Sequence, residues 1–209
     1  NMVEQQIRTW EVLDQEVLDL LYVIPREEFV PAEHRALAFS DLELPIGEGE
    51  RMWQPKLEAR VLQELALKKT DRVLEVGTGS GYLTALLAHR AAEVFSVELR
   101  PALAAFGREN LARHGSDNVV LETGDGARGW AAHAPYDAIV LTGSTPVLPS
   151  AFLEQLNPGG RAFAVVGEAP AMQARLVVCS APGAWRSVDL FETVIRRLAN
   201  AEQASRFRF

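Results

Sequence analysis

The sequence predicts an α/β fold, in which helices flank a mostly parallel sheet of seven strands with an antiparallel hairpin at one edge and a helical cap at the N-terminus. Two observations predict it. From residue 71 onward, short apolar runs alternate with helical patterns, which is typical of parallel strands joined by right-handed crossovers. Near the C-terminus, the strand-like runs 175–180 and 187–195 have no helix between them, which favours an edge hairpin. We expect one compact domain, with residues 1–69 as the cap and residues 70–209 as the core.

The cap is expected to be helical because its apolar residues recur at helical spacing. Asp14 is a suitable N-cap for a helix that Pro25 ends. Residues 41–50 contain one proline and two glycines, and we expect them to form a loop. A further helix is predicted to begin near Pro55, since proline is favoured in the first turn of a helix.

The core is expected to alternate strands with helices. The predicted strands share mainly apolar, often β-branched residues, and they are 72–76, 93–98, 118–126, 136–143, 161–167, 175–180 and 187–195. The predicted helices share a helical apolar pattern, and they are 81–90, 101–114 and 149–156.

Composition excludes some classes of protein. The 209 residues are 48% hydrophobic and 23% charged, as in ordinary globular domains. The net charge of −7 disfavours nonspecific nucleic-acid binding, because a phosphate backbone needs a basic field. The basic pair Arg196 and Arg197 and the terminal RFRF are expected to form a solvated face. No apolar run approaches the roughly 18 residues of a membrane span, so we expect no membrane partner.

The single cysteine, Cys179, lies in an apolar run and is expected to be a buried strand residue. One cysteine cannot form an internal disulfide, which is consistent with a reducing environment. With no signal peptide evident, we expect a cytoplasmic protein.

Three glycines at alternate positions suggest a ligand site. Gly77, Gly79 and Gly81 follow a predicted strand and open a helix, a context in which a ligand can approach the backbone closely. The dinucleotide fingerprint G-x-G-x-x-G requires another glycine at position 82, where Tyr82 stands. The Gly-Lys-Ser/Thr of a phosphate-binding loop is also absent. The ligand is therefore expected to be neither NAD nor a nucleotide held by a P-loop.

Acidic residues near the ends of successive strands indicate an adenosine-type cofactor. Glu98 ends the second strand, where a carboxylate can accept hydrogen bonds from both ribose hydroxyls. Asp125 follows the third strand and could accept from an adenine amine. Glu75, inside the first strand, suits a cationic ligand such as S-adenosylmethionine, which carries a sulfonium and an ammonium. The predicted cofactor-binding residues are Glu75, Gly77, Thr78, Gly79, Ser80, Glu98, Leu99, Asp125 and Gly126.

Motifs across the chain resemble known families. The stretches EVGTGSGY, SVE, GDG, YDAIVLT and LNPGGR resemble, in order and spacing, the class I S-adenosylmethionine-dependent methyltransferases. Further motifs are similar to the protein-L-isoaspartate O-methyltransferase family: MVEQQIR, PREEFVP, DLELPIGEG, the following QP, GDGARGW and HAPYDAIV. This resemblance implies a doubly wound, Rossmann-like methyltransferase sheet and S-adenosylmethionine as methyl donor. It also implies methylation of the isoaspartyl carboxylate in damaged proteins or peptides.

The chain departs from the family pattern on the acceptor side. Where the family usually has Thr-Ile-Ser-Gln-Pro, with the serine bordering the site of methyl transfer, this chain has RMWQP, so Trp53 stands at the serine position. The C-terminal segment also lacks the usual Val-Pro-Leu. Trp53 is a candidate for an aromatic lid, for a stacking surface for another acceptor, or for an obstacle. Arg51, two residues before it, is a candidate anchor for an acceptor carboxylate.

The expected chemistry needs no general base, because a carboxylate with a reference pKa of about 4 is already ionised at neutral pH. The four histidines lack metal-ligand spacing and are expected to be ordinary surface or core residues: His34, His89, His114 and His133. Two interpretations remain. One is a methyltransferase acting on isoaspartyl protein or peptide, or on another carboxylate or small-molecule acceptor. The other is a noncatalytic S-adenosylmethionine-binding protein whose acceptor channel Trp53 closes.

Overall fold

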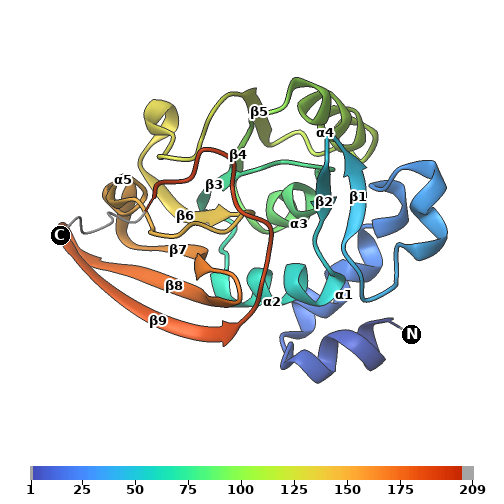
Figure 1. Ribbon diagram of the computed structural model, residues 1–209, viewed down its shortest axis with the longest axis horizontal. Coiled ribbons are helices and arrows are strands. Elements are labelled where there is room, and N and C mark those ends of the chain that lie inside the picture. Colours follow the sequence, from blue (N-terminus) through green and yellow to red (C-terminus); the bar gives the residue numbers. More distant parts are fainter. Residues whose placement is uncertain (1, 204–209) are drawn as a thin grey trace.

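A single sheet organises the core. The computed structural model describes residues 2–203, and within this range the main sheet has seven strands in the order β5-β4-β3-β6-β7-β8-β9. Its strands are β3 (Arg72–Val76), β4 (Glu93–Glu98), β5 (Val119–Thr123), β6 (Tyr136–Leu141), β7 (Leu156–Glu168), β8 (Ala171–Ala181) and β9 (Ala184–Glu192). Strands β3 to β7 pair in parallel, while β8 is antiparallel to both β7 and β9. The predicted sheet and its edge hairpin are confirmed, and the hairpin continues from β7 as a three-stranded meander (Figure 1).

The helices lie where the apolar pattern predicts them. They are α1 (Gln15–Val23), α2 (Pro55–Leu65), α3 (Tyr82–Arg90), α4 (Pro101–Arg113) and α5 (Ser150–Glu154). The short helical turns are Val3–Ile7, Arg8–Trp10, Arg26–Glu28, Ala32–Leu37 and Ala131–His133. Asp14 caps α1 as predicted, because its carboxylate accepts from the backbone N–H groups of Glu16 and Val17.

The sheet is doubly wound, since its two faces pack against different elements. Val73 and Val140 face α2, α3, α4 and the cap in one apolar cluster. Their neighbours Leu74 and Ile139 face the other way, into a cluster with Phe152 of α5. Alternate residues of a strand point to opposite faces, so strands covered on both sides become apolar throughout.

The N-terminal cap packs directly on the core. Its buried residues Ile7, Leu18, Phe29 and Leu62 belong to the same apolar cluster as Leu86 of α3 in the core. In Figure 1 the N-terminal part of the cap, drawn in blue, lies beside α2 and α3. Within residues 2–203, none of the helices combines the length and apolar character that a membrane span requires.

The prediction that residues 41–50 form an irregular loop was wrong. This region forms a hairpin of β1 (Leu44–Gly47) and β2 (Glu50–Met52), with Leu44 opposite Met52. The glycines that suggested a loop are turn residues: Gly47, Glu48 and Gly49 have φ angles of 99°, 51° and 73°. Two glycines allow this left-handed turn, while buried side chains on the flanking residues hold the strands against the cap.

The basic pair near the C-terminus is more than a solvated face. After β9 the chain, drawn in red in Figure 1, returns over the carboxyl ends of the strands. The N–H of Ser144 donates to the carbonyl of Arg196 at 2.9 Å, and the N–H of Leu198 donates to the carbonyl of Ser144 at 2.8 Å. Arg196 and Arg197 are partly exposed, but this pairing brings both to a cleft. The terminal RFRF lies outside the described residues.

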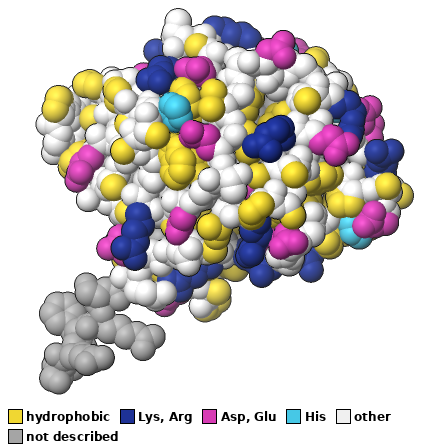
Figure 2. Space-filling view, turned by 90° about the horizontal axis from the view of Figure 1, so that it is seen from above, with side chains coloured by type: hydrophobic (Ala, Val, Ile, Leu, Met, Phe, Trp, Pro, Cys, Tyr) yellow, Lys and Arg dark blue, Asp and Glu magenta, His cyan; other side chains and the backbone are white. Residues whose placement is uncertain are grey.

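Charged side chains are mixed by sign rather than segregated. On the face seen in Figure 2, basic and acidic side chains lie interspersed among apolar and polar ones. Cys179, as predicted, is buried in β8 at 3% exposure.

Candidate active site

One cleft, at the carboxyl ends of the parallel strands, collects the residues singled out from the sequence. All nine predicted cofactor-binding residues line it: Glu75, Gly77, Thr78, Gly79, Ser80, Glu98, Leu99, Asp125 and Gly126. Arg51 and Trp53 also line it. From β3 the chain continues to β4 on one side of the sheet, and from β6 it continues to β7 on the other side. The connections after these two adjacent strands therefore diverge, and this leaves room for a ligand.

The glycine loop is shaped by contacts that only glycine permits. Gly77 has a φ of 99°, and a Cβ there would lie 2.1 Å from Oγ1 of Thr142. The Thr142 hydroxyl donates to the carbonyls of Val76 and Gly77, so it is itself held in place. The loop therefore runs tightly against the end of β6 and presents bare backbone to the cleft.

Glu98 joins this loop to the end of β4. Its Oε2 accepts from the N–H of Gly79 at 2.9 Å, and its Oε1 accepts from the N–H of Arg100 at 3.0 Å. The residue is 6% exposed. A carboxylate fixed by two backbone donors keeps its remaining lone pairs for a ligand in the cleft.

Glu75 is a buried carboxyl with spare capacity. Its Oε2 accepts from the hydroxyls of Thr84 and Ser96 at 2.5 and 2.6 Å, whereas its Oε1 has no partner among the described residues. Burial raises the pKa of Glu75 to about 8, against the two hydroxyl hydrogen bonds, and the nearby charge of Glu98 adds to the increase. A cation in the cleft would favour the ionised form of Glu75 and would give its Oε1 the partner that it lacks among the described residues.

Glu75→Gln should flatten part of the pH dependence of stability. The pKa of Glu75 rises from 4.5 to about 8 on folding, so the folded state binds the proton more tightly, and stability should fall as pH rises between these values. Without cofactor, we expect the unfolding free energy in urea to fall less between pH 5 and pH 8 in the variant than in the wild type. An identical pH dependence would contradict the assignment. The control is Glu93→Gln, a half-buried glutamate at the start of the neighbouring strand β4.

Asp125 meets a residue that the sequence did not suggest. Its Oδ1 accepts from the N–H of Ala127 at 3.0 Å, and its Oδ2 accepts from the side-chain amide of Asn200 at 2.9 Å. Asn200 follows the segment that crosses the strand ends. The C-terminal segment thus closes the cleft on the Asp125 side.

Residues 51–53, after the β1–β2 turn, combine a buried ring with an exposed guanidinium. Trp53 is 7% exposed, and its carbonyl accepts from Nη2 of Arg26 at 2.5 Å. Arg51 is exposed and donates to the carbonyl of Glu43 at 3.4 Å. Its guanidinium forms no ion pair with a carboxylate of the described residues. Trp53 therefore forms part of the cleft wall, while Arg51 offers it a cation.

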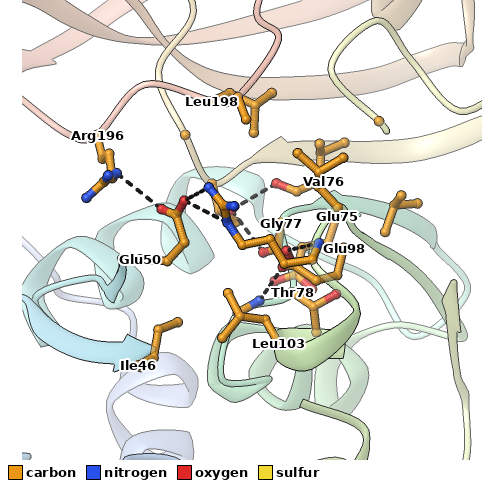
Figure 3. Close-up of a pocket in the computed structure, with 18 of the residues that line it drawn as sticks. Ile46, Glu50, Glu75, Val76, Gly77, Thr78, Glu98, Leu103, Arg196 and Leu198 are labelled. Carbon is orange, nitrogen blue, oxygen red and sulfur yellow. Dashed lines mark hydrogen bonds and ion pairs between the residues drawn. The ribbon is translucent and has the colours of Figure 1, made fainter. Parts of the chain in front are cut away.

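Sequence reasoning missed an ion-pair bridge across the cleft. Glu50 accepts from Arg100 at 2.7 Å and lies 3.3 Å from Nε of Arg196. Figure 3 shows Glu50 and Arg196 pointing toward each other beside the glycine loop. Arg100 and Arg196 are 50 and 146 positions after Glu50, so no local sequence pattern predicts this bridge.

None of the four histidines lines the cleft. His114 stacks on Phe29, and His133 stacks on Phe95 at a centroid distance of 4.2 Å. Within residues 2–203, no group of three or more His, Cys, Asp or Glu side chains is arranged to hold a metal ion.

Comparisons with known proteins agree on one family. The model described as "Protein-L-isoaspartate(D-aspartate) O-methyltransferase (PCMT)" matches residues 1–190. A protein-L-isoaspartate O-methyltransferase of Methanoculleus marisnigri is 48% identical over 166 residues, which are 79% of this chain and 76% of that protein. One from Synechococcus sp. is 40% identical over 190 residues, covering 88% of this chain and 78% of its own length.

Solved structures agree with these sequence matches. A protein-L-isoaspartate O-methyltransferase superposes with a TM-score of 0.77 at 27% identity, covering 91% of this chain and 63% of the other. A putative Plasmodium falciparum enzyme of this type, in complex with S-adenosyl-L-homocysteine, has the same TM-score at 20% identity. The superposition covers 94% of this chain and 96% of the other. At this identity the likeness supports a shared fold only.

Proposed function

The chain belongs to the protein-L-isoaspartate(D-aspartate) O-methyltransferase family, and from this we propose that it methylates the carboxylate of isoaspartyl residues in proteins or peptides, with S-adenosylmethionine as methyl donor. The observation that carries the proposal is that one cleft is lined both by the proposed cofactor loop, residues 75–80, and by the proposed acceptor loop, residues 51–53. The family match covers both loops.

The cleft fits this cofactor in its own chemistry. The tight turn at Gly77 leaves backbone open to a ligand. The free Oε1 of Glu75 is buried and suits a cationic group. The carboxylate of Glu98, held by two N–H groups, suits the hydroxyls of a ribose. We propose that these three residues hold the cofactor.

In this mechanism the protein aligns the acceptor carboxylate with the methyl donor, and no side chain has to transfer a proton. S-adenosylmethionine, when bound, supplies an activated methyl group on a sulfonium. The acceptor carboxylate, with a reference pKa of about 4, needs no base at neutral pH. We propose that Arg51 anchors this carboxylate through its guanidinium, whose planar fork matches two carboxylate oxygens. The walls that exclude water include Trp53 and Met52, both buried.

Trp53 is proposed to narrow the acceptor entrance. It stands where the resembling family has a serine, and a tryptophan replaces a small hydroxyl with a large apolar ring. Its backbone is tied to Arg26, and its ring belongs to the buried cluster beneath the cap. We therefore expect slow turnover of ordinary isoaspartyl peptides.

One assay tests the function and both loop residues. The protein is incubated with methyl-labelled S-adenosylmethionine and an isoaspartyl peptide, with the matching aspartyl peptide as control, and base-labile label is counted. We expect label on the isoaspartyl peptide only. Arg51→Ala should lower kcat/KM by about 10- to 100-fold, because a charged hydrogen-bond donor is lost. Trp53→Ser should raise kcat/KM by about tenfold, or about 1.4 kcal/mol.

The control is Arg186→Ala, an exposed arginine of β9 that does not line the cleft. If neither loop variant changes turnover, the loop is not the acceptor gate. If the protein binds S-adenosylmethionine but labels neither the peptide nor any protein of a cell extract, it is a noncatalytic binding protein.

A further inference from the structure

We propose that Arg26 is a positioning residue for methyl transfer, which fixes the backbone of the acceptor loop at Trp53 through a buried pair with Glu58. This inference rests on the proposed function, because the loop matters only if an acceptor binds beside it. Arg26 itself does not line the cleft, whereas Trp53 and Glu58 both do. Its effect on the reaction must therefore pass through the residues that it contacts.

The contacts of Arg26 use all three guanidinium nitrogens. The side chain is 1% exposed. Nε donates to the carbonyl of Ala38 at 2.8 Å, Nη2 donates to the carbonyl of Trp53, and Nη1 pairs with the carboxylate of Glu58. One planar group thus joins the cap, the acceptor loop and α2, and the rigid fork of an arginine is the side chain suited to this.

Fold stability alone is a poor reason for such a pair. Removing two charges from water is costly, and well-packed apolar residues often stabilise a core equally well. Burial raises the pKa of Glu58 to about 7, and Arg26 opposes this increase. Glu58 is 2% exposed and lines the same cleft as Trp53. The costly pair therefore lies at the acceptor loop, where an exact backbone position affects the reaction.

Arg26 also contacts the cofactor side. Its Cζ lies 5.1 Å from the centroid of the Tyr82 ring. Tyr82 is buried, and it is the first residue of α3, directly after the glycine loop. The same guanidinium thus packs on the helix that follows the cofactor loop and bonds to the acceptor loop. It is placed to set the distance between the two reacting sides.

Arg26→Lys is the informative variant. A lysine keeps the positive charge opposite Glu58, but a single ammonium cannot reach all three acceptors. We expect kcat/KM for an isoaspartyl peptide to fall by about 10- to 100-fold, as small misplacements of reacting groups do. Binding of S-adenosylmethionine, measured by calorimetry, should change by no more than about twofold.

Arg60→Lys is the matched control. Arg60 lies on α2, donates to the carbonyl of Trp10 and pairs with Glu11 and Glu64, so it also ties the N-terminal region to this helix. It does not line the cleft or contact the acceptor loop. Its kcat/KM should match that of the wild type.

A second readout needs no turnover. Acrylamide quenching of Trp53 fluorescence is obtained by subtracting the signal of the matching Trp53→Phe protein. In the wild type, Trp53 should be protected, whereas Trp185, at 38% exposure, marks a reachable ring. In Arg26→Lys, quenching of Trp53 should rise toward that of Trp185, and in Arg60→Lys it should not.

The proposal is overturned if Arg26→Lys behaves like Arg60→Lys in both readouts, even if both lose stability. If Arg26→Lys does not fold, Glu58→Gln replaces it, with Glu64→Gln as control. Glu58→Gln should lower kcat/KM and expose Trp53, and a result equal to that of the control overturns the proposal. If the wild type methylates no isoaspartyl peptide, the proposed function fails, while quenching still decides whether Arg26 fixes the loop.

Discussion

Gly77→Ala is expected to weaken binding of S-adenosylmethionine by about 100-fold or more, equivalent to about 3 kcal/mol, and to destabilise the fold. The backbone at this position has a φ of 99°, which costs an alanine about 1–2 kcal/mol. Its Cβ would also meet Oγ1 of Thr142 at 2.1 Å, so either the loop or the end of β6 must move. We expect a total loss of about 3–5 kcal/mol in urea unfolding. Calorimetry measures the binding.

Two variants separate backbone strain from the clash. Gly183→Ala introduces the same kind of strain, at a φ of 77°, but its Cβ would have no neighbour within 4 Å. It should cost about 1–2 kcal/mol and leave binding unchanged. Adding Thr142→Ala to Gly77→Ala removes the clashing oxygen and should recover part of the stability. If Gly77→Ala costs no more than Gly183→Ala, the close packing of the loop on β6 is wrong.

Glu98→Ala is expected to weaken S-adenosylmethionine binding by about 1–3 kcal/mol, or about 5- to 150-fold. Two effects add. The ribose hydroxyls would lose a charged acceptor, and the N–H of Gly79 would lose the oxygen that holds it at 2.9 Å. Calorimetric titration of the variant with S-adenosylmethionine gives the affinity directly.

The control for Glu98→Ala is Glu93→Ala, at the start of the same strand. Glu93 makes a surface contact with Arg72 at 3.6 Å, and such pairs contribute little. Its loss should leave the affinity within about twofold of the wild type. An unchanged affinity in Glu98→Ala would remove Glu98 from the cofactor site.

Local patterns determined most of the fold. The alternation of apolar runs and helices predicts the central strands β3, β4 and β6, because burial on both faces makes parallel strands apolar throughout. Asp14 predicts the start of α1, since an N-cap acts only on its own first turn. Gly77, Glu75 and Glu98 could be assigned to one edge because the carboxyl ends of parallel strands meet there.

The hairpin at 44–52 shows where local patterns stop being sufficient. Its proline and glycines are typical of a loop, and the strands form because Leu44 and Met52 find a buried surface on the cap. A two-stranded hairpin is at best marginal by itself, so its stability comes from packing partners distant in sequence.

The sequence by itself determined the alternation of strands and helices in the parallel core, and the edge at which the glycine loop and its acidic residues gather, because both follow from short-range periodicity and from the common direction of parallel strands. Only the tertiary structure decided how the cleft wall around Glu50, Trp53 and Glu58 is built. Glu50 reaches Arg196 across 146 positions, and Arg26 holds Trp53 and Glu58 across 27 and 32 positions. Such contacts depend on how the cap, the hairpin and the C-terminal segment converge, and charges carry no periodicity from which that convergence can be predicted.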